Sequence, residues 1–200
     1  MLVLRSSPAS PFGRKVKIAA AVLGLRDRFT IEIADTMDQQ DSLRGQNPLG
    51  KIPTLVFPNG DVLYDSRVIL DYLDWMAGGE KIIPPAPARF DVLRLQALAD
   101  GIADAAILRV YEDRFREAGH RSERWLAHQT GKVDRGLASL EPGPLPELGA
   151  VPHAGAIALA CTLGYLDLRA PGWRPNYPNL AAWLGSFERQ VPAFTETRAP

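Results

Sequence analysis

The stretch Asn47-Pro48-Leu49-Gly50-Lys51-Ile52-Pro53-Thr54-Leu55 places a turn rich in glycine and proline directly before a short apolar run. A proline that opens a strand after such a turn is a candidate for a cis peptide bond, so we expect Ile52–Pro53 to be cis. A plain loop before an edge strand would explain the same pattern. Alternatively, the backbone N–H and C=O of Ile52 are unpaired and bind a peptide-like ligand by strand addition.

The chain after this stretch predicts a β-hairpin followed by a helix. Residues 54–57 and 62–64 flank the sequence Pro58-Asn59-Gly60-Asp61, whose Asn-Gly pair supplies the positive φ angles of a tight turn. From Asp65 to Met76, apolar side chains recur at intervals of three and four residues, which is the spacing of an amphipathic helix.

Two strands and a helix are predicted before residues 47–55. Residues 1–4 form a short apolar run, and residues 29–33 alternate between apolar and polar side chains. Between them, residues 12–25 carry apolar side chains at helical spacing, and Gly24 ends the pattern. The resulting order over residues 1–77 is β-α-β-α-β-β-α, which specifies a small mixed sheet with helices packed on it.

The composition changes after residue 77. Residues 78–87 are rich in glycine and proline and indicate a linker. Beyond the linker no segment resembles a strand, and helical patterns cover residues 90–119, 122–140, 154–166 and 180–190. The predicted fold class is therefore α+β, with a mixed domain over residues 1–77 and an all-α domain over residues 88–200.

Composition and charge exclude several classes of protein. The 200 residues include 23 Lys+Arg and 23 Asp+Glu, so the basic excess of a nucleic-acid-binding protein is missing. No apolar run reaches the ~18 residues of a membrane helix, and the first residues do not form a signal peptide. The single Cys161 cannot form an internal disulfide, which fits a reducing compartment. We expect a cytoplasmic protein that binds neither nucleic acid nor membranes.

Ser10 is the first candidate for chemistry. In the stretch 7–16 a strand ends and a helix begins, with Ser10 at the N-cap and Pro11 at the first helical position. Capping of the helix would explain the serine. Alternatively, the free N–H groups and the helix dipole form an anion site, in which the hydroxyl donates a hydrogen bond to a bound thiolate and lowers its pKa.

Asp65 and Ser66 stand at the start of another predicted helix. Capping would again explain both residues. The alternative is that the carboxylate, together with unsatisfied N–H groups, holds the ammonium and carboxylate groups of a ligand.

These motifs and the helical second half together resemble the cytosolic glutathione S-transferase family. Residues 10–15, 47–53 and 65–66 occur in the order and spacing of that family, and residues 164–167 and 173–175 resemble the C-terminal segments of bacterial members. The resemblance covers the whole chain. It implies a thioredoxin-like N-terminal domain followed by an all-α C-terminal domain.

The resemblance also implies a catalytic role for Ser10, as the serine at the thiol-activating position of a bacterial member. Phe12 would form a wall beside the thiol. Because serine cannot form a mixed disulfide, redox exchange through Ser10 is not expected.

The remaining glutathione contacts implied by the resemblance come from two motifs. Lys51 would bind the glycine end of glutathione, and Ile52, ahead of cis-Pro53, would pair its backbone with the cysteinyl unit. Asp65 and Ser66 would hold the γ-glutamyl group.

The function implied is that of a homodimeric glutathione transferase active in detoxification. Glutathione would be the co-substrate, no metal would be needed, and the thiolate would attack a small, mostly apolar electrophile in a pocket of the second domain. A glutathione-dependent isomerase or dehalogenase is one alternative on this fold. A non-catalytic protein that binds glutathione or a protein partner is another.

Polar residues outside these motifs give weaker signals. His120, His128 and His153 are scattered without partners at metal-ligand spacing, so we expect no metal site. Asp100 and Asp104 lie one helical turn apart and suggest either paired acids or, as the preferred interpretation, a solvated face. The resemblance suggests that Asp104 reaches the glutathione of a partner subunit.

The second half contains three further features of interest. Cys161 falls in the most apolar predicted helix and is expected to be an inert core thiol. Tyr111, Phe115 and Trp173 would line the electrophile pocket or, as the preferred interpretation, form part of the core. Residues 153–156 lack the capping box of many family members, and His153 is expected to cap weakly through a ring nitrogen.

Overall fold

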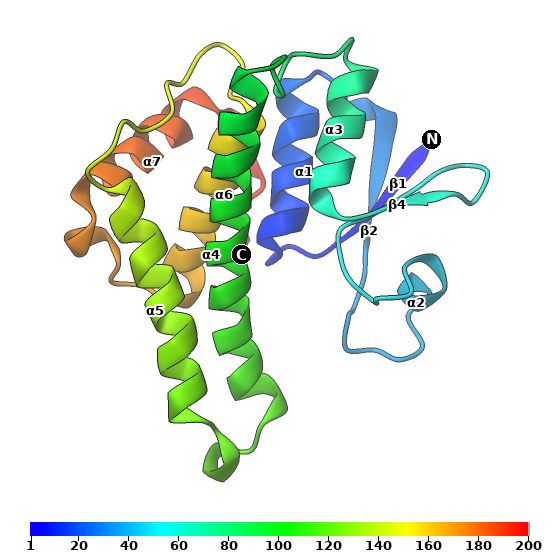
Figure 1. Cartoon of the computed structure of the whole chain (residues 1–200). Coiled ribbons are helices and arrows are strands. Elements are labelled where there is room, and N and C mark those ends of the chain that lie inside the picture. The colour runs from blue at the N-terminus through cyan, green and yellow to red at the C-terminus, as the bar shows by residue number, and fades with distance from the viewer. Residues whose placement is uncertain (200) are drawn as a thin grey trace.

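The computed structural model describes residues 1–199 and shows the expected α+β fold, a small sheet region followed by a helical region (Figure 1). The strands are β1 (Leu2–Ser6), β2 (Phe29–Ile33), β3 (Thr54–Val56) and β4 (Val62–Leu63), in the sheet order β2-β1-β3-β4. Strand β1 is parallel to β2 and antiparallel to β3, and β3 is antiparallel to β4. The sheet is therefore mixed, as the order of elements predicts.

Helices α1 (Pro11–Val22) and α3 (Ser66–Met76) pack side by side in the sheet region, and the short α2 (Leu43–Gln46) contacts β3 (Figure 1). The helices of the second region are α4 (Ala88–Phe115), α5 (Glu123–Leu140), α6 (Ala154–Arg169), α7 (Pro178–Gln190) and α8 (Pro192–Glu196). The last of these, α8, was not predicted from the sequence.

The turn between β3 and β4 differs from the expectation. Gly60 has a positive φ of 90°, whereas the φ of Asn59 is not positive. The Asn59 side chain instead accepts a hydrogen bond from the Asp61 N–H at 3.1 Å. The Phe57 N–H donates to the Asp61 carbonyl at 2.8 Å. This bond closes a loop longer than the two-residue turn that Asn-Gly favours, so only the glycine needs the left-handed conformation.

Helix α6 lies at the centre of the second region and is buried along most of its length. Its packing against α4 requires a small residue, because a Cβ on Gly155 would lie 2.8 Å from the Val92 carbonyl oxygen. His153 caps the helix as expected, with Nδ1 accepting a hydrogen bond from the Ala156 N–H at 3.1 Å. Burial lowers the pKa of His153, which favours the neutral ring that this cap requires.

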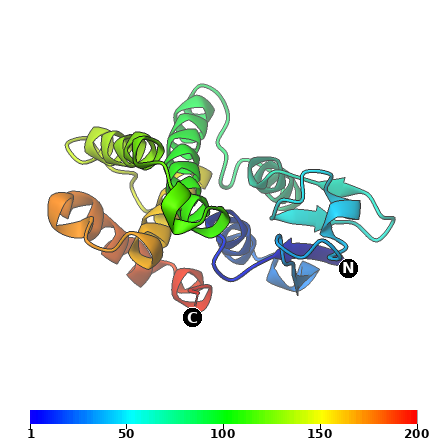
Figure 2. The ribbon, with the colours of Figure 1, turned by 90° about the horizontal axis from the view of Figure 1, so that it is seen from below.

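Helix α1 joins the two regions, because it packs on α3 and also on α6 (Figure 2). Residues 78–87 contain neither helix nor strand, but hydrogen bonds fix them to the neighbouring helices. The Asp74 carboxylate accepts hydrogen bonds from the N–H groups of residues 80–82, and the Ile82 carbonyl accepts one from the Ala154 N–H at 2.8 Å. Because Ile82 is also fully buried, this segment fixes α6 against α3.

Candidate functional site

The junction of β1 and α1 places Ser10 at the N-cap, where its Oγ accepts a hydrogen bond from the Gly13 N–H at 3.1 Å. Ser10 therefore caps α1, and Pro11 occupies the first turn as expected. Accepting this bond uses only a lone pair, so the hydroxyl proton remains free to be donated. Gly13 allows the close approach of α1 to β1, because a Cβ there would lie 2.1 Å from the Ser6 Oγ.

A cavity of about 460 Å³ opens beside this junction, between the loop before α1, the turn before β3, helix α4 and the end of α6. It brings together four of the predicted site residues, Ser10, Phe12, Lys51 and Ile52. Pro53, Asp65 and Ser66 are not among the residues that line it.

The turn before β3 is organised by the buried Asn47. Its Nδ2 donates to the Lys51 carbonyl at 2.9 Å and to the Thr54 Oγ1 at 3.1 Å, and its Oδ1 accepts from the Leu49 N–H at 3.0 Å. The Ile52–Pro53 peptide is cis, as predicted. In the described residues, no hydrogen bond joins the backbone N–H or C=O of Ile52 to another group, so both can pair with a ligand.

Asp65 is the N-cap of α3 and also pairs with Arg67. Its carboxylate accepts from the Arg67 N–H at 2.9 Å and from the Arg67 Nη2 at 2.9 Å. Partial burial would raise the pKa of Asp65, but these hydrogen bonds outweigh it, so the pKa lies below its usual range. The carboxylate is therefore ionised at neutral pH, and its remaining lone pairs can accept from an ammonium group. Ser66 is the buried first residue of the helix.

The expectation of a solvated acidic face on α4 is wrong for Asp100. This residue is 7% exposed, and both of its carboxylate oxygens accept hydrogen bonds from the Lys15 Nζ, at 2.7 and 2.8 Å. Lys15, which belongs to α1, supplies the cation that a buried carboxylate needs. Asp104 remains exposed and lines the cavity.

The aromatic residues of the second region have three different environments. Tyr111 lines the cavity and is 37% exposed, so the preferred interpretation as a core residue is wrong for it. Phe115 packs edge-on against Tyr111 but is mostly exposed, so it belongs neither to the core nor to this cavity. Trp173 is buried, and its Nε1 donates to the Asp167 Oδ1 at 2.9 Å. It is therefore a core residue.

The cavity residues that the sequence did not indicate include Arg114, Tyr165 and Arg169. Arg114 follows Tyr111 by three residues on one helix, so helical spacing could have indicated that it shares this face. Tyr165 and Arg169 belong to α6, and no local pattern shows that the end of this helix reaches α4.

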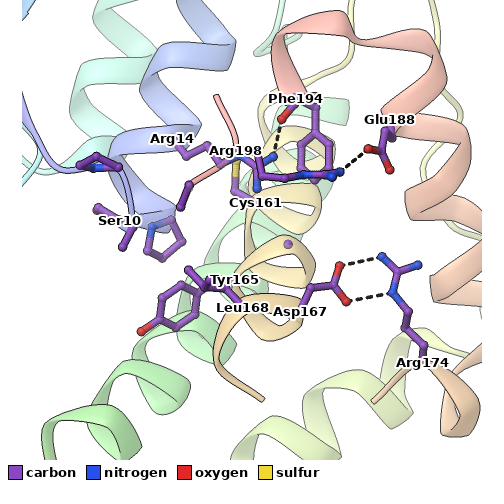
Figure 3. A pocket seen from close by; sticks show the side chains of 15 residues that line it. Ser10, Arg14, Cys161, Tyr165, Asp167, Leu168, Arg174, Glu188, Phe194 and Arg198 are labelled. Carbon is purple, nitrogen blue, oxygen red and sulfur yellow. Dashed lines mark hydrogen bonds and ion pairs between the residues drawn. The ribbon is translucent and has the colours of Figure 1, made fainter. Parts of the chain in front are cut away.

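A second cavity of about 440 Å³ shares Ser10 and Tyr165 with the first cavity and extends toward α7 and α8 (Figure 3). Its charged groups are engaged with one another, since Arg174 pairs with Asp167 and Arg198 pairs with Glu188. Arg14 donates to the Phe194 carbonyl, and its guanidinium carbon lies 3.8 Å from the centre of the Phe194 ring.

Cys161 also lines this second cavity but is only 2% exposed. Burial raises the pKa of its thiol to about 12. Because the thiolate is the reactive form, this supports an inert thiol.

Residues 1–199 contain no group of three His, Cys, Asp or Glu residues arranged to hold a metal ion. In the same part of the chain, no helix has the length and apolar character needed to span a membrane.

The fold and the cavity that contains Ser10, Lys51 and Ile52 define a class of protein. Comparison with known families identifies that class. Residues 4–81 match the glutathione S-transferase N-terminal domain, and residues 123–186 match the C-terminal domain of the same family. The chain belongs to the glutathione S-transferase family.

Individual relatives span the whole chain. A solved glutathione transferase family member from Pseudomonas fluorescens Pf-5, with bound glutathione, is 43% identical over 100% of both chains, with a TM-score of 0.93. A glutathione S-transferase from Methylobacillus flagellatus KT with glutathione bound is 35% identical over 100% of both chains, with a TM-score of 0.88. The uncharacterized GST-like protein YibF of Escherichia coli K12 is 36% identical, covering 96% of this chain and 97% of its own.

Proposed function

We propose that this protein is a glutathione transferase that binds glutathione, stabilises its thiolate through Ser10 and conjugates it to a small electrophile. One observation carries the proposal. A single cavity contains a serine hydroxyl with a free proton at a helix N-terminus, the unpaired backbone of Ile52 and the cation of Lys51. The glutathione bound to relatives 43% and 35% identical supports the same ligand here.

Each group in the cavity suits one part of the tripeptide. The Ile52 backbone would pair with the cysteinyl unit, and Lys51 would bind the glycine carboxylate. Asp65 and Ser66, which lie outside the lining of the cavity, would hold the γ-glutamyl group as it extends toward the start of α3. Phe12 would then form an apolar wall next to the sulfur.

The chemistry proposed is activation of the thiol followed by nucleophilic attack. The Ser10 hydroxyl donates a hydrogen bond to the sulfur, and the dipole of α1 adds further stabilisation of the negative charge. The thiol proton leaves to solvent. The thiolate then forms a bond to the electrophilic carbon, and the leaving group departs with its bonding electron pair.

The two regions of the chain have different proposed roles. We propose that residues 1–77 bind glutathione, that residues 88–200 supply the electrophile pocket, and that residues 78–87 link them. Ser10, Lys51 and Ile52 come from the first region, whereas Tyr111 and Tyr165 come from the second.

We also propose that the protein acts as a cytoplasmic homodimer in detoxification. Large apolar side chains are exposed on α3 and at the start of α4, with Trp75 70% and Phe90 66% exposed. A second copy that covers this surface would remove it from water. Sedimentation equilibrium should give twice the mass of 21.9 kDa, and a monomer at micromolar concentration would contradict the dimer.

Replacement of Ser10 by alanine tests the catalytic proposal. Loss of a hydrogen bond to a charged sulfur costs ~1.5–3 kcal/mol, which raises the pKa of the bound thiol by about one to two units. The measurement is the ultraviolet absorbance of the thiolate in the glutathione complex as a function of pH. The rate at neutral pH should fall about ten- to a hundredfold with little change in glutathione affinity.

Ser122→Ala is the matched control. Ser122 caps α5, where its Oγ accepts from the Trp125 N–H at 3.2 Å, and it is not among the residues that line the cavity. Both variants lose a helix cap worth about 1 kcal/mol, but only Ser10→Ala should shift the thiol titration. Identical titrations for the parent and Ser10→Ala would leave Ser10 as a cap only, and Ser7, which also lines the cavity, would be tested next.

A further inference from the structure

The end of the 460 Å³ cavity that lies away from Lys51 is positively charged. Arg114, in the last turn of α4, and Arg169, the last residue of α6, both line it. Asp104 is the only carboxylate among the described residues that line the cavity. Arg114 lies ten residues further along α4, which corresponds to about 15 Å.

Asp104 belongs to the Lys51 end. Partial burial raises the pKa of Asp104, and the strongest opposing effect comes from Lys51, followed by Arg67. The charges that act on this acid, the cations Lys51, Arg67 and Lys15 and the carboxylate Asp65, therefore all belong to the first region. Asp104 does not neutralise the guanidinium groups at the opposite end.

Arg114 and Arg169 form no ion pair within residues 1–199. The acids near the end of α4 are used by other arginines, since Glu112 pairs with Arg116 and Asp113 pairs with Arg121. The two cationic groups that face the cavity are therefore available to an anion.

Each of the two arginines lies near a tyrosine that lines the cavity. The Arg114 guanidinium carbon lies 5.6 Å from the centre of the Tyr111 ring. Burial raises the pKa of Tyr165, while Arg169 and Arg114 both act in the opposite direction because they stabilise the phenolate. Both cations thus lie within electrostatic reach of the same hydroxyl group.

We propose that this end of the cavity is an anion-binding subsite and that the electrophile carries a carboxylate held by Arg114 and Arg169. Arginine suits this role because its planar donors match a carboxylate and its charge is weakly hydrated. Leu108, Tyr111 and Tyr165 would pack on the apolar body of the substrate between the carboxylate and the sulfur. The subsite rests on the proposed function, since it assumes that glutathione occupies the Lys51 end.

A purely structural role for the two arginines makes a different prediction. Basic residues in the last turn of a helix complement the helix dipole, and both arginines stand at such positions. That role would affect stability only. It would not make binding depend on the charge of a ligand.

The test compares two glutathione conjugates that differ at one group. A chlorodinitrobenzoate and the matching chlorodinitrobenzamide each react with glutathione when the sulfur bonds to the ring carbon and chloride leaves with the bonding pair. The two purified products carry a carboxylate or a neutral amide of nearly the same shape. Calorimetry then measures the affinity of each product, so that the result does not depend on turnover.

The parent should bind the carboxylate conjugate about ten- to a hundredfold more tightly than the amide conjugate. Arg114→Gln and Arg169→Gln should each reduce this ratio about three- to tenfold, and the double variant should abolish it. Added salt should also reduce the ratio, because these charges are exposed. Arg124→Gln is the matched control: Arg124 lies on the exposed start of α5 and does not line the cavity, so the ratio should not change.

An equal affinity of the parent for both conjugates, or a ratio unchanged in the double variant, would overturn the subsite. In that case, the proposed function would still be supported if the pKa of the bound thiol is higher in Ser10→Ala than in the parent. If neither conjugate nor glutathione itself binds, both the subsite and the proposed function fail.

Discussion

Replacement of Lys15 should destabilise the protein strongly, because it leaves the Asp100 carboxylate without its partner. Lys15 is 1% exposed, and its Nζ contacts both oxygens of Asp100 at 2.7 and 2.8 Å. The only other cation near this carboxylate is the Arg67 Nε at 3.9 Å, among the ion pairs of residues 1–199. The pair therefore ties α1 to α4 in a region from which water is excluded.

The magnitude follows from this burial. Removal of one partner of a buried ion pair costs about 3–5 kcal/mol. For a chain of this size, each kcal/mol lowers the melting temperature by about 2–4 °C, so Lys15→Met should melt about 6–20 °C below the parent. The double variant Lys15→Met/Asp100→Leu removes both charges and should recover most of this loss.

The cost should also depend on pH. Burial raises the pKa of Asp100 in the folded protein above that of an unfolded aspartate, an effect that Lys15 opposes in the parent. Without Lys15, the folded form binds the proton more tightly than the unfolded form. Proton binding by Asp100 therefore stabilises the folded Lys15→Met variant. This contribution is fully present below the unfolded pKa of about 3.9 and is lost as the pH rises through the raised folded pKa. Lys15→Met should therefore be closest to the parent in stability near or below about pH 4 and should fall further behind it as the pH rises.

The assay is urea unfolding followed by far-ultraviolet circular dichroism at one fixed protein concentration. It compares the parent, the single variants Lys15→Met and Asp100→Leu, and the double variant. A coupling free energy of about 2 kcal/mol or more between the two positions would support the argument. Single variants that each lose less than about 1 kcal/mol, or losses that simply add, would refute it.

Two further predictions concern Asp65 and Cys161. Asp65→Ala should raise the KM for glutathione far more than it lowers kcat, because a contact with the γ-glutamyl ammonium is the same in the ground and transition states. Asp65→Asn, which keeps the helix cap, separates this effect from loss of capping, and an unchanged glutathione affinity in both variants would remove Asp65 from the site. Cys161 should resist iodoacetamide at pH 7 in the folded protein, because its thiol pKa is about 12, and should react only after unfolding in urea. Rapid alkylation of the native protein would show that α6 opens easily.

The sequence by itself determined the local features of this protein. Ser10 and Asp65 each begin a helix as side-chain caps, and His153 caps α6 in place of the usual box. These signals depend on the hydrogen bonds of residues only two or three positions away, so the chain carries them without reference to the fold. The motif at 47–55 likewise indicated both the cis bond and the strand that follows it.

The tertiary structure alone decided how distant segments share one environment. Asp100 was expected on a solvated face, but it is buried and pairs with Lys15, which lies 85 positions away in the sequence. Arg114 and Arg169 line the same cavity only because the ends of α4 and α6 lie together. Burial and long-range charge depend on which element covers a given face, and helical spacing defines the face without naming what packs against it.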